Sequence, residues 1–254
     1  MLGCETHGRG APLVLIHAFP LSRKMWHATA AILKNKFCVI LPDLPGFGNS
    51  TRQTHPSVPD MAAEMIPLLD HLKIKEPVIL AGLSLGGYVA FECVRQFPKR
   101  IRALGLFATR ATPDSPEARE NRFRSIEALE KFGMEPYAKK IVKSQLGKTT
   151  QEKHPEILKE AVSIMTANSR EGAVDALKAM AGRRDSSNFL DSIRVPTLVM
   201  AGEEDALIPL AEMKNMHLKI PGSEFHAVPQ SGHLINLEQP EVFHQIFQNF
   251  LNQF

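Results

Sequence analysis

Short apolar runs alternate with amphipathic stretches along this chain of 254 residues. Apolar runs bounded by glycine or proline are typical of buried strands, whereas apolar positions three or four residues apart predict helices. Strands are therefore expected at 11–18, 37–41, 77–83, 101–108, 197–201 and 225–228. Helices are expected at 25–34, 61–72, 85–97 and 241–254, with a kink at Pro67 because proline cannot complete the helical hydrogen bonds. This alternation predicts an α/β fold with a mostly parallel sheet that helices cover on both faces.

One long segment, residues 112–189, breaks this alternation because it contains no convincing strand. Its patterns are helical instead, and its numerous charges of both signs fit solvated helix faces. We interpret it as a helical lid inserted between two strands of the sheet. The expected organisation is a core of residues 1–111 and 190–254 around a lid of residues 112–189. The helices expected within the lid cover 117–132, 136–146, 155–168 and 171–181.

Composition and charge restrict the classes of partner. The formal net charge of +3 gives no electrostatic signature of nucleic-acid or anionic-membrane binding. No apolar run approaches the roughly 20 residues that span a bilayer, and the first residues lack the basic start of a signal peptide. The three cysteines are odd in number and far apart, which fits free thiols in a reducing cytoplasm. A cytoplasmic enzyme of small molecules is expected, and the sequence carries no signal for an oligomeric state.

The most informative motif is Gly-x-Ser-x-Gly at 82–86, between the strand at 77–83 and the helix at 85–97. A serine on such a strand-turn-helix elbow presents its Oγ at the amino end of the helix, where backbone dipoles converge. Glycines two positions before and two after the serine allow the strand and helix to cross closely. Ser84 is thus the candidate nucleophile.

A serine hydroxyl needs a base within hydrogen-bond reach and an acid that orients the base. Among the ten histidines, His233 follows the last predicted strand in Ser-Gly-His, where catalytic groups of open α/β sheets gather. His226 is the alternative, but it lies inside that strand, where packing is the simpler role.

The orienting acid is expected between serine and histidine in the chain. Asp205 follows the strand at 197–201, so that it lies beyond a strand end as the other two residues do. Glu203 and Glu204 are alternatives, with exposed loop charges as their simpler interpretation. The predicted catalytic residues are Ser84, Asp205 and His233.

A tetrahedral intermediate also needs preorganised N–H donors for its oxyanion. The backbone N–H of Leu85, directly after the nucleophile, and that of Phe19, in the loop after the first long strand, are the candidates. His17 is expected to hydrogen-bond this loop, and Asp43 to fix the loop after its own strand. Arg183 and Arg184 are expected to be structural or solvated, with attraction of a substrate carboxylate as the alternative.

These motifs together resemble the α/β-hydrolase superfamily over nearly the whole chain, and in particular small carboxylesterases of the 3-oxoadipate enol-lactonase and pimeloyl-ester esterase kind. One departure is Ala18, where the family usually has glycine after histidine, which puts the shape of the oxyanion hole in question. The resemblance also implies that the Phe19 side chain lies near the substrate. The segments that carry it are 15–20, 42–50, 82–86, 202–209 and 231–233.

The chain is therefore expected to be a serine hydrolase that cleaves a carboxylic ester, thioester or lactone of a small to medium apolar acyl compound through an acyl-enzyme, without metal or organic cofactor. Phe19, Phe123 and Tyr137 are the candidate substrate-binding residues. A C–C bond hydrolase and a cofactor-free perhydrolase of the haloperoxidase type are alternatives on the same three residues. A ligand receptor on a hydrolase fold is an alternative of another class, recognised by very slow turnover.

Overall fold

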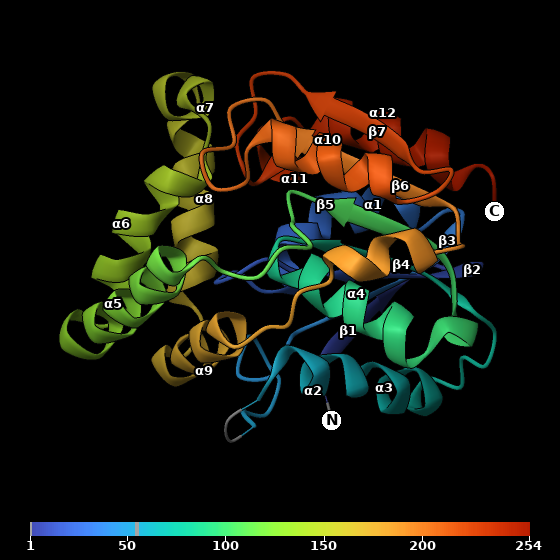
Figure 1. Cartoon of the computed structure of the whole chain (residues 1–254), viewed down its shortest axis with the longest axis horizontal. Coiled ribbons are helices and arrows are strands. Elements are labelled where there is room, and N and C mark those ends of the chain that lie inside the picture. Colours follow the sequence, from blue (N-terminus) through green and yellow to red (C-terminus); the bar gives the residue numbers. More distant parts are fainter. Residues whose placement is uncertain (1, 54–55) are drawn as a thin grey trace.

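A twisted, mostly parallel sheet forms the centre of the computed structural model, which describes residues 2–53 and 56–254 (Figure 1). Residue 1, the first of the expected core segment, lies outside the described residues. Within the described part, seven strands lie in the order β1-β3-β2-β4-β5-β6-β7, and only β1 runs antiparallel to its neighbour. This confirms the predicted sheet. Its strands are β1 (Cys4–His7), β2 (Ala11–Ile16), β3 (Phe37–Pro42), β4 (Val78–Leu83), β5 (Ile101–Phe107), β6 (Thr197–Gly202) and β7 (Glu224–Val228).

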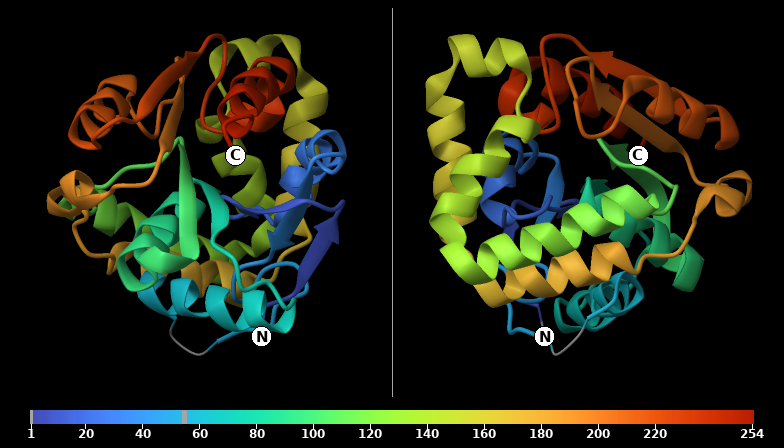
Figure 2. Two further views of the ribbon diagram at one scale, coloured as in Figure 1. Left: turned by 90° about the vertical axis from the view of Figure 1, so that its right-hand side faces the viewer. Right: turned by 60° about the vertical axis from the view of Figure 1, so that its left-hand side comes forward.

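Helices cover both faces of the sheet, because successive side chains of its central strands enter opposite apolar layers. In β2, Val14 and Ile16 join one core cluster, and Leu13 and Leu15 join the other. The first layer is completed by α2 (Val58–Ala63), α3 (Met65–His71), α4 (Leu85–Gln96) and α10 (Leu210–Lys219), and the second by α1 (His27–Leu33), α11 (Ile235–Glu238) and α12 (Pro240–Leu251) (Figure 2). Short 3-10 helices are η1 (Arg23–Trp26), η2 (Pro98–Arg100) and η3 (Ser187–Ser192).

The helix predicted at 61–72 differs from the observed structure. Two helices, α2 and α3, cover this region and part at Glu64. Pro67 is the physical reason, since it lacks the N–H that would bond the carbonyl of residue 63 and its ring crowds that carbonyl. Ser57 and Asp60 start α2 earlier than expected through a reciprocal capping box. Helix α10 was not predicted.

The segment between β5 and β6 is helical, as expected for 112–189, and gathers on one side of the sheet (Figure 1). We call its helices α5 to α9 the helical insertion. Helix α5 packs against α9, and α6 packs against α8. Helix α7, between the predicted helices, was missed because its sequence is polar almost throughout. The insertion comprises α5 (Pro116–Phe132), α6 (Met134–Gln145), α7 (Lys148–Lys153), α8 (Pro155–Thr166) and α9 (Arg170–Ala181).

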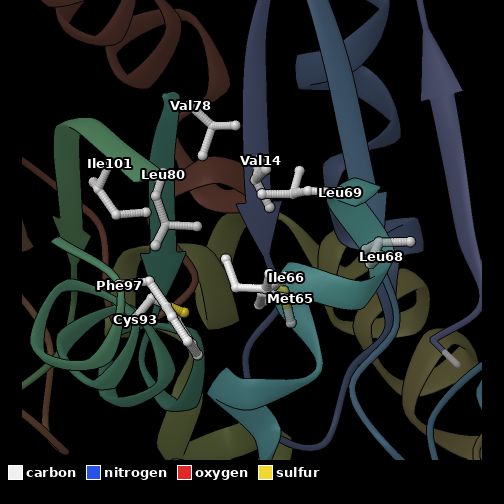
Figure 3. A pocket seen from close by; sticks show the side chains of 10 residues that line it. All are labelled: Val14, Met65, Ile66, Leu68, Leu69, Val78, Leu80, Cys93, Phe97 and Ile101. Atoms are coloured by element: carbon white, nitrogen blue, oxygen red, sulfur yellow. The ribbon is translucent and has the colours of Figure 1, made fainter. Parts of the chain in front are cut away.

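The first apolar layer contains a small cavity with an almost entirely apolar wall. It lies between the sheet, α3 and α4, and measures about 10 Å³, close to the smallest space that holds one water (Figure 3). The only thiol in its described wall is that of Cys93, and burial raises the pKa of this thiol above its usual value. No helix in the described ranges is both long and apolar enough to cross a membrane.

Candidate active site

Ser84 lies on a strained turn between β4 and α4. Its φ of 55° and ψ of −112° place a residue other than glycine in a rarely populated region, as nucleophile elbows do. The flanking glycines permit the crossing predicted from the sequence. A Cβ on Gly82 would lie 2.1 Å from the carbonyl oxygen of Gly86, and one on Gly86 would lie 2.3 Å from that of Ile16. The elbow is therefore pressed against the end of β2.

His233 and Asp205 form a buried hydrogen-bonded pair on the loops after β7 and β6. Nδ1 of His233 lies 2.8 Å from Oδ2 of Asp205, and both side chains are almost fully buried. The other carboxylate oxygen, Oδ1, accepts hydrogen bonds from the backbone N–H groups of Leu207 (2.8 Å) and Ile208 (3.0 Å). Because a carboxylate only accepts, Nδ1 carries the proton and Nε2 is left as the basic nitrogen.

Ser84 and His233 open onto one cavity of about 300 Å³, the size of a small-molecule site. Since β4, β6 and β7 are parallel, their carboxyl ends bring the loops with Ser84, Asp205 and His233 to one edge of the sheet. The helical insertion supplies much of the remaining wall. The apolar part of the wall includes Phe19, Ile141, Leu177, Met180, Leu207 and Ile208, and the polar part includes Tyr88, Arg110, Asp114, Asn121, Arg122, Ser125, Tyr137, Ser144 and Gln145.

The two candidate oxyanion donors belong to different segments: Phe19 lines the cavity from the loop after β2, and Leu85 directly follows Ser84, which also lines it. Leu85 is the first residue of α4, so its N–H has no partner within the helix. The N–H of Ala18 lies 3.2 Å from the sulfur of Met25, which leaves the next N–H, that of Phe19, as the candidate on this loop. Ala18 is not among the residues with positive φ. Alanine therefore occupies this position, where the family usually has glycine, without the strain of a left-handed backbone.

His17 supports the loop from beneath, as predicted. Its Nε2 accepts a hydrogen bond from the N–H of Leu44 at 2.9 Å, so Nδ1 donates to the carbonyl oxygen of Ala18 at 2.9 Å. Burial lowers the pKa of His17, which keeps the ring neutral for this pattern. Asp43 accepts from the guanidinium and the backbone N–H of Arg23. Its Oδ2 also accepts the N–H of Asn49 at 3.0 Å, in the loop after β3, which agrees with the expected structural role.

Gln145 of α6 links the insertion both to His233 and to the loop that contains Phe19, and it is not among the residues predicted from the sequence. Its carbonyl oxygen accepts the N–H of His233 at 2.8 Å, and its Nε2 donates to the carbonyl oxygen of Phe19 at 2.8 Å. The remaining amide oxygen is buried without a hydrogen-bond partner among the described residues. No sequence pattern marks this glutamine, since its role depends on how α6 docks.

Several alternatives and candidates from the sequence occupy other positions. Phe123 is 44% exposed and does not line the cavity, which corrects its assignment as a substrate-binding residue; Phe19 and Tyr137 do line it. His226 is exposed on β7 and lies near Glu224, whereas Asp205 bonds His233. Glu204 is not a free loop charge, because it accepts hydrogen bonds from the N–H and hydroxyl of Thr149 at the start of α7.

Comparison with known proteins agrees with this architecture. The model of a family described as alpha/beta hydrolase fold matches residues 11–240. A thermophilic esterase from Thermogutta terrifontis, solved with malate bound, superposes with a TM-score of 0.95 and 39% identity over 99% of this chain and 93% of its own. Among curated relatives, 3-oxoadipate enol-lactonase 2 of Acinetobacter baylyi is 25% identical over 95% of this chain and 89% of its own length. The pimeloyl-[acyl-carrier protein] methyl ester esterase of Legionella pneumophila is 26% identical over 97% and 98%.

The match of the family model covers most of the chain, and the central sheet, the elbow and the order of the loops agree with it. The chain therefore belongs to the α/β-hydrolase family and is a hydrolase.

Proposed function

We propose that this protein is a serine hydrolase of carboxylic esters, and that Ser84, His233 and Asp205 are its catalytic residues. The observation that carries the proposal is the buried His233–Asp205 pair, which shares one cavity with the strained Ser84. A histidine that is oriented by a carboxylate and opens onto the same cavity as a serine hydroxyl is the arrangement that activates a serine at neutral pH.

The proposed reaction follows from these positions. Oγ of Ser84 attacks the ester carbonyl while Nε2 of His233 takes its proton, and His233 then gives that proton to the leaving alkoxide. Asp205 holds the ring in the required tautomer and stabilises its cation. The N–H groups of Leu85 and Phe19 would bind the oxyanion. Water then attacks the acyl-enzyme with His233 again as the base, and the acid and free Ser84 are released.

The relatives support ester or lactone hydrolysis as the reaction class, because the similar proteins include an esterase, an enol-lactonase and a methyl ester esterase. In this proposal the helical insertion acts as a lid: Tyr137 and Ile141 of α6 and Leu177 of α9 wall the cavity over Ser84. The cavity volume of about 300 Å³ favours a small to medium acyl compound. The shape and polarity of this wall would determine which ester the protein prefers.

The test compares the wild-type protein with Ser84→Ala on p-nitrophenyl esters of increasing acyl length. Loss of nearly all turnover, together with a burst of p-nitrophenol from the wild type and mass labelling of Ser84 by a fluorophosphonate, is the expected result. Hydrolysis that survives the substitution unchanged would refute Ser84 as the nucleophile. Single or very slow turnover on every ester, with ligand-dependent binding of a partner, would favour a receptor instead.

A further inference from the structure

An arginine of the helical insertion, Arg122 of α5, forms part of the wall of the cavity that holds Ser84. Its Nε and Nη2 both bond the carboxylate of Asp114, the second at 3.1 Å. Its Nη1 lies 3.3 Å from the sulfur of Met180, a weak acceptor. Each terminal nitrogen of a guanidinium carries two N–H groups, so both retain a donor for another acceptor.

The charge of Arg122 is only partly balanced, because a second arginine shares the same carboxylate. Arg183 donates to Oδ1 of Asp114 at 2.6 Å, and its guanidinium stacks on the ring of Tyr88 at 4.3 Å. Two guanidinium groups and one carboxylate leave this cluster with one net positive charge. The two arginines also hold the pKa of Asp114 below its usual value, although burial opposes them. Asp114 thus remains ionised, and its negative charge is included in the net charge of +1 given for the cluster.

The other charges on the cavity wall do not cancel this excess. Arg110, also in the wall, is paired with Glu212 at 3.4 Å. Among the described residues that line the cavity, Asp114 is the only Asp or Glu. An anion that enters would therefore find the free donors of Arg122 unopposed by a second carboxylate.

Polar groups surround Arg122 on the same wall. Ser125 follows Arg122 by three residues and Asn121 by four on α5, and all three line the cavity. Tyr137 of α6 lines it as well. On the opposite side, Tyr88 stands one turn after Ser84 in α4 and lies under Arg183. A path of contacts through Tyr88, Arg183 and Asp114 therefore connects the elbow with Arg122.

We propose that Arg122 forms an anion subsite, and that the preferred esters carry a carboxylate several bonds away from the scissile carbonyl. This inference rests on the proposed ester hydrolysis at Ser84 and refines the expectation of a purely apolar acyl group. The planar fork of Arg122 would hold the carboxylate through the donors that Asp114 and Met180 leave free. The apolar wall would cover the chain between the two ends.

The experiment measures kcat/KM for two matched series of methyl esters. One series comprises the monomethyl esters of succinate, glutarate and adipate, and the other comprises the methyl esters of their monoamides, which have the same length without the charge. Acetate esters of hydroxy acids and of the corresponding hydroxy amides place the charge on the alcohol side. The variants are Arg122→Gln, Arg122→Lys and, as a matched control on α5, Arg124→Gln, whose exposed side chain pairs with Glu120.

We expect the wild-type protein to prefer a charged ester over its uncharged amide partner of the same length, with the charge on either the acyl side or the alcohol side. The expected preference is about ten- to hundredfold, the range of a hydrogen bond to a charged group. Arg122→Gln should abolish this preference while neutral esters are still cleaved, Arg122→Lys should retain part of it, and Arg124→Gln should leave it unchanged. Equal rates for charged and neutral esters in wild type overturn the subsite even if no variant folds, as does a preference that survives in Arg122→Gln. In both cases ester hydrolysis by Ser84 stands, whereas failure to cleave any ester refutes the proposed function itself.

Discussion

The side chain of Glu238 binds the backbone on both sides of His233. One carboxylate oxygen, Oε1, accepts the N–H groups of Gly232 and Leu234, each at 3.0 Å. The other, Oε2, accepts the N–H of Gly147 and the hydroxyl of Thr150, each at 2.7 Å. A single buried carboxylate thus ties the histidine loop to the start of α7, although burial raises its pKa against the effect of these four donors. We infer that Glu238 is a positioning residue for His233.

Glu238→Gln is expected to lower kcat more than it changes KM. The amide can accept from one pair of donors but turns its NH₂ toward the other pair, so the loop of His233 shifts. Small displacements of a reacting group cost up to about a hundredfold in rate, and we expect a loss of about ten- to hundredfold. Steady-state kinetics measures it, and urea denaturation should show a loss of about 1–3 kcal/mol of unfolding free energy.

Two variants separate positioning by Glu238 from a general loss of stability. Thr150→Val removes one of the four donors and should cause a smaller fall in kcat in the same direction. Glu241→Gln changes a neighbouring glutamate in the first turn of α12, where no such network exists among the described contacts, and should leave kcat unchanged. Equal kinetics for wild type and Glu238→Gln would contradict the positioning role.

Asp205→Asn tests the proposed acid. The asparagine can hold the histidine in the wrong tautomer, and the corresponding change in a serine protease triad lowers kcat by about 10⁴. We expect a loss of this order in ester turnover, with the fold preserved in circular dichroism. Glu203→Gln is the matched control, since Glu203 is exposed and its backbone N–H bonds Val228. A similar loss in both variants would exclude Asp205 as the specific partner of His233.

Ala18→Gly tests whether alanine in the oxyanion loop shapes catalysis. Ala18 is fully buried and its backbone lies outside the left-handed region, so glycine gains nothing there and adds freedom to the unfolded chain. The substitution should lower the unfolding free energy by about 0.5–1 kcal/mol and leave kcat/KM within about twofold of wild type. A large gain in kcat, measured on the same esters, would show that the methyl group impairs the oxyanion hole.

His17 makes stability depend on pH in a defined direction. Burial lowers its pKa in the folded protein, and the charge of Arg23 acts in the same direction. Asp43 and the bond to Ala18 oppose this effect without reversing it. The unfolded chain therefore binds the proton more readily. Stability is then full above the unfolded pKa of about 6.5 and falls as the pH drops below it. Protonation would also break the bond from Leu44 to Nε2.

Denaturant unfolding at a series of pH values from about 8 to 5 measures this dependence. His17→Gln should be less stable near neutral pH but lose less on acidification than wild type. His244, whose pKa burial lowers too, contributes in the same sense and remains in both proteins. His226→Gln, on the exposed side of β7, should reproduce the wild-type slope, and an unchanged slope in His17→Gln would rule out His17 as a source of it.

Local sequence patterns predicted much of the core because its strands and their loops leave few alternatives. An apolar run such as 77–83 is too short for a typical helix and starts at a proline, which favours a buried strand. The glycines beside Ser84 are required by contacts with neighbouring backbone. Asp205 and His233 were predicted as partners because parallel strands bring the loops at their carboxyl ends to one edge. The observed bond between them agrees with that pairing, while their catalytic roles remain predictions.

Predictions within the helical insertion were less complete, as α5 illustrates. Its aromatic Phe123 points outward, and its charged Arg122 faces the cavity. The sequence predicts that α5 is a helix, but it does not specify which neighbours cover each face. Arg122 faces the cavity because its guanidinium binds Asp114 in the cavity wall. The same carboxylate binds Arg183, which follows α9.

The sequence by itself determined the fold, the elbow and the chain order of the candidate catalytic residues, because these depend on local periodicity, on close approaches that only glycine allows, and on parallel strand order. The tertiary structure alone decided which side chains of α5 and α6 enclose Ser84 and that Glu238 binds the loop of His233. Those contacts join residues far apart in the chain, and the energy of burying each charge depends on a partner that no local pattern identifies.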